Sequence, residues 1–176
     1  MTQETIIRLK QIRTDALYGK KKHFNAADRK KTYQTALGTS VIIINVLLGS
    51  ALLALLKTEV PEPMKWIGAG MAAFAAVLTS IQTFFGYQKV IAGHRHVANR
   101  YLEVSKQISN TLAGHNDNAI QNIDLLKRLE NFTTTMSKIN ADANAYPTND
   151  DDYRKAKKGI ESGEEHYTDR ELGAGS

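Results

Sequence analysis

Two long stretches without charge constrain the fold of this chain more than any other feature. Residues 32–56 and residues 66–88 contain no acidic or basic side chain, although the mean hydropathy of the whole chain is mildly negative. Each stretch is close to or longer than the roughly 20 residues with which a helix crosses a ~30 Å hydrocarbon layer. A soluble helical hairpin of this kind would need more apolar helices around it than the chain supplies. We therefore predict two transmembrane helices.

Basic side chains gather at the outer ends of these two stretches. Residues 12–31 carry seven cations and residues 89–108 carry four, whereas the connecting residues 57–65 carry two lysines and two glutamates. By the positive-inside rule, both termini are predicted to lie in the cytoplasm. The net charge of +5 then faces anionic lipid headgroups. The basic run "GKKKH" has no nucleic-acid motif around it, so we predict no nucleic-acid partner.

Composition divides the chain into four predicted segments. Residues 1–31 are expected to form an amphipathic basic helix, and residues 32–88 a transmembrane hairpin whose loop is residues 57–65. Residues 89–146 have heptad-like spacing, which predicts a cytoplasmic helical hairpin that continues from the second span without a break. Residues 147–176 mix acids and bases with few apolar side chains, which predicts a disordered charged tail. The expected fold is an all-α membrane protein, a two-transmembrane helical hairpin with a cytoplasmic helical bundle.

The predicted cytoplasmic helices carry apolar seams with alternating spacings of four and three residues. A shorter seam in the amino-terminal helix makes that helix available to complete a bundle. The residues that we expect to form the cytoplasmic seam are His94, Val97, Tyr101, Ile108, Leu125, Leu129, Phe132 and Met136.

Side chains in arrangements typical of catalysis or metal binding do not occur in the sequence. There is no cysteine, which excludes disulfides and thiolate ligands. His94 and His96 are two residues apart, so on a helix they point about 200° from each other and cannot bind one ion. We expect His94 on the packing seam and His96 on a basic face. The sequence therefore predicts no catalytic, cofactor-binding or metal-binding residue, and not an enzyme.

Small residues recur every fourth position in the second span. Gly68, Ala72, Ala76 and Ser80 form this row. In lipid the hydrophobic effect no longer drives helix against helix, and small residues allow close backbone packing instead. The row predicts helix packing within one chain, between chains, or both.

Polar side chains also lie within the spans. Thr79, Gln82 and Thr83 share one face of the second span, and Asn45 lies at the centre of the first. Hydroxyl groups can bond to their own helix, but an unpaired buried amide costs about 1–3 kcal/mol. At 1.5 Å per residue, Gln82 lies roughly 10 Å and Asn45 roughly 20 Å from the cytoplasmic side, so they are not expected to pair. We predict that each amide meets its copy in a homo-oligomer or water in a lumen.

The arrangement resembles the SLATT family, bacterial two-transmembrane effectors associated with SMODS nucleotidyltransferases and SLOG nucleotide sensors. The resemblance covers residues 1–145. It is carried by the basic helix from Ile6 to Lys31, the two spans with their proline-bearing loop, and "AGHRHVANRYLEVSKQI" after the second span. Within that last segment the matching residues are Ala92, His96, Ala98 and Tyr101.

The resemblance implies an inner-membrane effector of antiphage defence. A sensor or nucleotidyltransferase partner encoded nearby would supply the trigger, and the effector would then assemble or open in the membrane. Since the chain contains no recognisable nucleotide motif, a separate partner or a hidden ligand site must provide the signal. The alternative is a non-conducting membrane scaffold whose cytoplasmic helices dock a partner protein.

Overall fold

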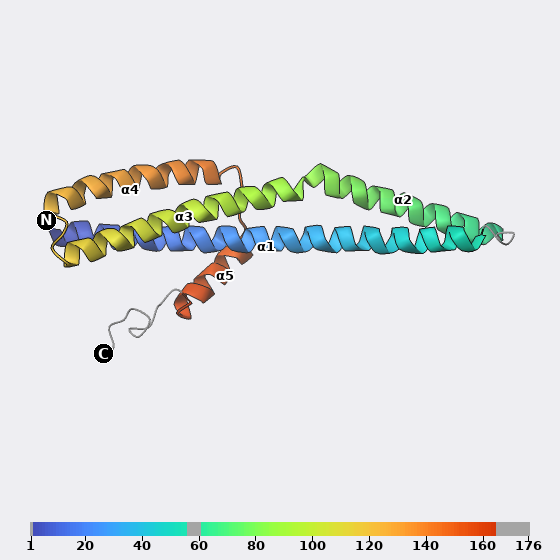
Figure 1. Ribbon diagram of the computed structural model, residues 1–176, viewed down its shortest axis with the longest axis horizontal. Helices are drawn as coiled ribbons and strands as arrows, with labels where there is room; N and C mark the ends of the chain where they lie inside the picture. The colour runs from blue at the N-terminus through green and yellow to red at the C-terminus, as the bar shows by residue number, and fades with distance from the viewer. Residues whose placement is uncertain (1, 56–60, 165–176) are drawn as a thin grey trace. The chain divides into compact units, whose positions relative to one another are not determined.

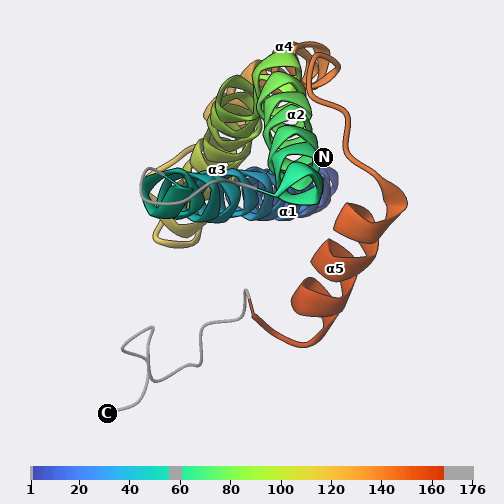
Figure 2. The same cartoon turned by 90° about the vertical axis from the view of Figure 1, so that its right-hand side faces the viewer.

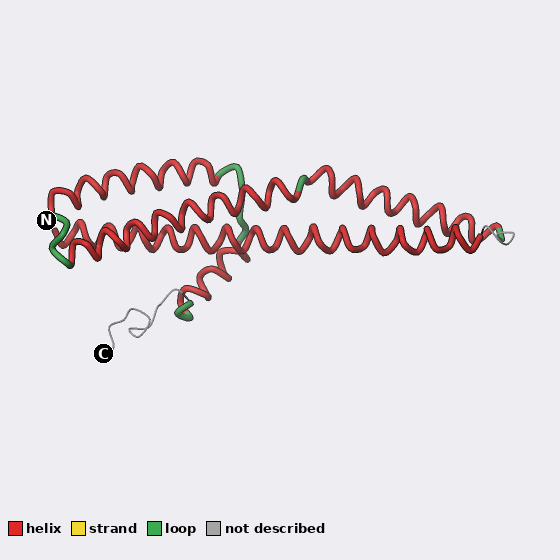
Figure 3. Tube along the Cα trace, in the orientation of Figure 1, coloured by secondary structure: helices red, strands yellow, loops and turns green. Residues whose placement is uncertain are grey.

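Helices joined by turns make up the described part of the protein (Figure 1). The computed structural model describes residues 2–55 and 61–164, and no strand occurs within these ranges (Figure 3). The all-α prediction is thereby confirmed. The helices are α1 (Thr2–Leu55), α2 (Glu62–Phe85), α3 (Tyr87–Asn116), α4 (Asn122–Ala143) and α5 (Asp150–Glu161).

These helices form two compact units. The hairpin unit comprises Asp28–Ile91, and the bundle unit comprises Met1–Ala27 with Ala92–Ser176. Helix α1 contributes to both units without a break, so the predicted boundary at residue 31 is not a boundary in secondary structure. Of the predicted loop 57–65, residues 57–60 lie outside the described ranges. Helix α2 begins at Glu62, so residues 62–65 are helical although they were predicted to belong to the loop.

The hairpin unit exposes apolar side chains that a soluble protein would bury. Trp66 is 75% exposed and Phe84 is 85% exposed, and most of the exposed large apolar side chains of the described chain belong to this unit. In the 18-residue apolar segments of the two candidate membrane helices, only 0% and 6% of the segment is buried. Both helices are long and apolar enough to cross a membrane. Lipid is the solvent that such a surface requires, because contiguous exposed apolar area is unfavourable in water.

The sequence predicts that the second membrane helix continues as one rod into the following helix. The structure instead divides this rod into two helices. Helix α2 ends at Phe85, and Gly86 adopts a left-handed conformation with φ 50° and ψ 41° before α3 begins at Tyr87 (Figure 3). Glycine reaches this region without the steric penalty that a Cβ would bring. A single glycine C-cap thus interrupts a pattern that hydrophobic periodicity alone reads as continuous.

The core of the bundle unit is built from the seams of α1, α3 and α4. Its largest fully buried apolar side chains are Leu9, Ile108, Leu125 and Ile139. Burying an aliphatic side chain of this size contributes about 1.5–3 kcal/mol. Helices α3 and α4 are antiparallel, since a short turn joins the end of α3 to the start of α4 while Asp142, near the end of α4, pairs with Arg100 in the first half of α3. Figure 1 shows these two helices side by side.

Residues 150–161 form helix α5, which corrects the prediction of a disordered tail from residue 147. Asn149 accepts a hydrogen bond from the backbone N–H of Asp152, and the Asp152 carboxylate accepts one from the N–H of Asn149. This capping box satisfies two backbone donors at the start of the helix. Figure 2 shows the chain leaving α4 and continuing into α5. The predicted tail beyond residue 164 lies outside the described residues.

Helix α5 packs against α1 through small and polar side chains. Its buried residues are Asp152, Ala156 and Gly159. The side chain of Asn25 donates to the carbonyl oxygen of Asp152 at 3.0 Å, and the rings of Tyr18 and Tyr153 stack with centroids 6.0 Å apart. The contact therefore depends on a well-formed helix more than on a large apolar surface.

Removing the side-chain cap should loosen α5. We expect Asn149→Ala to destabilise the helix by about 0.5–2 kcal/mol, because the N–H of Asp152 loses its acceptor. Limited trypsin digestion should then cut faster at Lys155 and Lys158. Asn144→Ala is the control, since Asn144 is exposed and caps α4 through its backbone N–H. Equal cleavage rates in both variants would contradict this account of the helix start.

Candidate functional site

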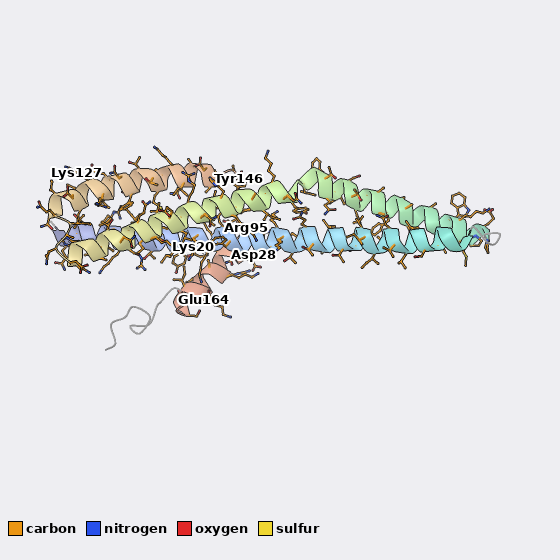
Figure 4. The ribbon with its side chains drawn as sticks, in the orientation of Figure 1. Lys20, Asp28, Arg95, Lys127, Tyr146 and Glu164 are labelled. Carbon is orange, nitrogen blue, oxygen red and sulfur yellow. The ribbon has the colours of Figure 1, made fainter. Side chains whose placement is uncertain are left out.

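A cluster of imidazole and phenol rings joins α1, α3 and the segment after α4. We call it the histidine junction, and it consists of His23 on α1, His94 and Tyr101 on α3, and Tyr146. Figure 4 labels Tyr146 just beyond α4. Both histidines are almost fully buried, at 1% and 0% exposed. Polar rings rarely occupy the interior of a helical bundle unless they have partners.

The two histidines contact each other directly. Their Nδ1 atoms are 3.1 Å apart, and their ring centroids are 5.3 Å apart. The ring of Tyr101 lies 5.9 Å from His23, and the ring of Tyr146 lies 5.8 Å from His94. The four rings thus form a continuous series across the unit.

Two glycines make room for the tyrosine rings. A Cβ atom at Gly19 would lie 2.9 Å from three ring atoms of Tyr101, and one at Gly93 would lie 1.9 Å from Cε1 of Tyr146. Any side chain at either glycine would displace a ring. The packing of each tyrosine ring directly against the backbone of a glycine therefore fixes which residues of the junction lie opposite one another.

The short Nδ1–Nδ1 distance requires the two rings to be in different tautomers. One histidine must carry its proton on Nδ1 and donate it, and the other must accept with an unprotonated Nδ1. Burial lowers the pKa of His23 from 6.5 to about 4, with further lowering by the neighbouring His94 and Lys22, while Asp152 opposes the shift. His23 is consequently neutral at neutral pH.

Tyr101 fixes α3 to α4 at the edge of the junction. Its hydroxyl group donates a hydrogen bond of 2.6 Å to Oδ1 of Asn140. Burial raises the pKa of Tyr101, which keeps the phenol protonated and able to donate. The junction therefore connects α1 to α3 through imidazole and α3 to α4 through phenol.

The histidine junction combines buried packing with groups that can bind protons. Within residues 2–55 and 61–164, no three histidine or carboxylate side chains come together in a way that could hold a metal ion. The chemical property of the junction is that two cationic rings cannot occupy it together, because like charges at this distance in a buried site repel strongly.

Sequence reasoning placed His94 on a seam but did not identify His23 as its partner. The signal was present, because the seam of Leu9, Ile12 and Ala16 continues with the same spacing through Gly19 and His23. Because glycine and histidine do not count as apolar residues, the apolar periodicity of the amino-terminal helix seemed to end at Ala16.

The remaining predicted seam residues all lie in the bundle unit. Leu129 and Met136 are half-buried against the core, and the others are buried. In the segment that carries the family resemblance, Ala98 and Tyr101 are buried, whereas Ala92 and His96 are exposed. The exposed position of His96 and the buried position of His94 place the two rings on different faces of α3.

The predicted polar stripe lies in the hairpin unit. Asn45, Thr79 and Thr83 are exposed, and Gln82 is half-buried, with its Nε2 atom 3.3 Å from where a Cβ of Gly38 would be. The Thr79 hydroxyl donates to the carbonyl oxygen of Ala75 at 2.9 Å. Among the described residues, neither the Asn45 nor the Gln82 amide has a hydrogen-bond partner.

The row of small residues on α2 points away from the rest of the hairpin unit. Ala72, Ala76 and Ser80 are exposed, and nothing lies within 4 Å of a Cβ built at Gly68. Ala75 is instead the buried residue of α2. The contacts within the hairpin unit therefore leave this row uncovered.

The histidine junction should make stability depend on pH. Because the pKa of His23 is lowered in the folded state, the unfolded chain binds its proton first as the pH falls. Stability should be complete above about pH 6.5 and decline towards pH 4, with a loss of about 1–2 kcal/mol at pH 5. Thermal unfolding of the detergent-solubilised protein between pH 7 and pH 5 measures this decline.

Two single substitutions test the assignment of the decline to His23. His23→Gln keeps a hydrogen-bonding side chain that does not titrate, so the midpoint should vary less with pH than in the wild type. His96→Gln removes an exposed imidazole from α3 and should leave the wild-type slope unchanged. An unaltered slope in the His23 variant would show that other groups cause the pH dependence.

Comparison with known families places this architecture. The family model of the SMODS and SLOG-associating 2TM effector domain family 4, SLATT_4, matches residues 6–171. No curated protein and no solved structure matches the chain significantly. The family match extends past the resemblance seen at residues 1–145 and includes α5. Because the match covers most of the chain and the hairpin unit supplies two apolar helices, the protein is a membrane protein of the SMODS and SLOG-associating 2TM effector domain family 4.

Proposed function

We propose that this effector acts in the bacterial inner membrane during antiphage defence, where it assembles into a homo-oligomer that forms or gates a pore. A nucleotide signal or a sensor partner encoded nearby would trigger it. Membership of an effector family associated with SMODS and SLOG proteins supports the defence role and the partner. The proposal adds the assembly, the polar path and the membrane in which it operates.

The observation that carries the pore proposal is that two amides of the hairpin unit have no hydrogen-bond partner among the described residues. Asn45 is exposed on α1, and Gln82 is half-buried on α2. An amide that faces hydrocarbon without a hydrogen bond costs about 1–3 kcal/mol on mutational scales. A second copy of the chain or a water-filled path would supply the missing partners, as is usual for polar side chains within membranes.

The second candidate function is a non-conducting scaffold, and one observation favours it. The Thr79 and Ser80 hydroxyls bond to carbonyl oxygens of their own helix, at 2.9 and 2.8 Å. These two groups therefore require neither water nor a second chain. In this alternative the amides serve only to join helices, and the bundle unit docks a partner protein.

The orientation of the chain is the first test of the proposal. Because cations flank both outer ends of the spans, the segment around Pro61 should face the periplasm and both termini the cytoplasm. Alkaline phosphatase fused at the carboxyl terminus should be inactive, and green fluorescent protein at the same site should fluoresce. The opposite pattern would reverse the topology.

Assembly should depend on the uncovered row of small residues. Ala76→Leu should weaken association, because a large side chain prevents close approach of helix backbones. The matched control is Ala73→Leu, an exposed alanine of α2 that lies outside the row. Cross-linking in membranes compares the two variants with the wild type. If both variants form the same cross-linked species as the wild type, the row is not an interface.

Ion flux should depend on Gln82. Gln82→Leu removes the amide with little change in size and should reduce flux while expression and assembly persist. Gln88→Leu is the control, since Gln88 is an exposed glutamine at the start of α3. The measurement is a membrane-potential dye in cells that produce the protein together with its trigger.

A second variant separates conduction from folding. Leu129→Asp places a charge against the core of the bundle unit and should abolish both activity and assembly. If cells with the wild-type protein stop growing while their membrane potential remains intact, the pore proposal fails and the scaffold takes its place.

A further inference from the structure

A cleft of about 530 Å³ lies between α1 and α5 in the bundle unit. Four lysines line it, Lys20 and Lys21 from α1 and Lys155 and Lys158 from α5. Figure 4 labels Lys20 on α1 and Glu164 just after α5, which both line this cleft. The cleft is separate from the histidine junction and shares no residue with it.

The described residues that line this cleft include more lysines than carboxylates. Among the described residues that line it, Glu164 supplies the single carboxylate, and that carboxylate pairs with Lys21. Lys155 and Lys158 are three residues apart and so share one face of α5. Bringing like charges from two helices to one cleft is unfavourable unless an anion offsets them.

The other cations of α5 provide an internal comparison. Arg154 pairs with Asp151 at 2.7 Å, and Lys157 approaches Glu161 at 3.7 Å, so both have a carboxylate on their own helix. Among the described residues, Lys155 and Lys158 make no ion pair of comparable distance, although the Asp151 carboxylate interacts electrostatically with Lys155. Two cations of α5 are thus in close ion pairs on their own helix, and two others line the cleft.

The backbone and the floor of the cleft also suit a ligand. At Gly159, a Cβ would lie 2.7 Å from Nζ of Lys21 and 2.6 Å from Oε2 of Glu164, so the absence of a side chain admits this ion pair. Phe24 and Leu102 add apolar surface beside the lysines. An anion that carries an apolar or planar group could contact both kinds of surface.

We propose that this cleft binds a phosphate-bearing anion. Lysine ammonium groups bind phosphate as point charges, and four of them around one cleft offset a multiply charged group. Because lysines from both α1 and α5 would contact the anion, binding would hold α5 against α1. The proposal concerns the bundle unit alone and does not depend on whether the hairpin unit conducts ions.

The phosphate could belong to a lipid headgroup or to a soluble molecule. These two sources share the phosphate chemistry that the lysines would bind, and the lipid arm of the test distinguishes them.

The test uses the full-length protein in an uncharged detergent and inorganic pyrophosphate as the probe, with isothermal titration calorimetry at low ionic strength. The double substitution Lys155→Gln with Lys158→Gln should weaken binding by about tenfold or more. Lys20→Gln, on the opposite wall, should weaken it as well. The charge-matched control is Arg154→Gln with Lys157→Gln, which should bind as the wild type does. Unchanged thermal midpoints confirm that the variants are folded.

A lipid arm distinguishes the two sources of phosphate. The same proteins in phosphatidylcholine nanodiscs, with and without phosphatidylglycerol, are examined by native mass spectrometry for retained lipid. Retention of phosphatidylglycerol that requires Lys155 and Lys158, without pyrophosphate binding, would support the site and assign it to a headgroup. Absence of both kinds of binding overturns the proposal. Equal losses in the cleft double and the control double overturn it too, because they indicate nonspecific attraction.

Discussion

The outward-facing apolar surface of the hairpin unit is the constraint on which the rest of the structure depends. The charge-free stretches of α1 and α2 can lie side by side with Trp66 and Phe84 exposed only if lipid surrounds them. This requirement removes the hydrophobic effect as a force between the helices and leaves close packing and polar contacts to join them. The same requirement leaves most of the charged side chains, and the functions that depend on water, to the bundle unit. The amides of Asn45 and Gln82 gain significance for the same reason, since in water they would need no explanation.

Hydrophobic periodicity predicted the parts of the fold in which apolar side chains carry the packing. The spans, the turn after α3 and the seams of α3 and α4 follow from spacing, because residues such as Val97, Ile108 and Leu125 are both apolar and buried. The same method stopped where packing depends on other side chains. His23 and Gly19 continue the seam of α1 by position. However, neither the contact between the two imidazole rings nor the packing of Tyr101 on the backbone of Gly19 can be recognised from hydropathy. Hydropathy alone therefore could not identify the partner of His94, although the spacing that leads to His23 was present in the sequence.

Helix α5 illustrates a second limit of the same kind. Its buried residues Asp152, Ala156 and Gly159 keep a spacing of four and three residues, yet none is a large apolar side chain. A composition of acids, bases and small residues usually indicates disorder, because it buries too little to offset the entropy of ordering. Here a capping box fixes the first turn, and aromatic stacking and a hydrogen bond to Asn25 attach the helix to α1. The local signal was the pair of Asn149 and Asp152 at capping-box spacing, which hydropathy ignores.

Continuity of the backbone decides which helix can carry movement between the two units. A helix transmits rotation or translation along its axis only while its hydrogen bonds continue, and α3 is separated from α2 by Gly86 in a left-handed conformation. A glycine joint absorbs a change in backbone angles locally, as hinges do. Helix α1, by contrast, runs from Thr2 to Leu55 without interruption and carries both His23 and Asn45. Helix α1 therefore passes from the bundle unit into the hairpin unit without a joint, whereas α2 and α3 meet at one. Within the bundle unit, the histidine junction is the contact that ties α1 to α3.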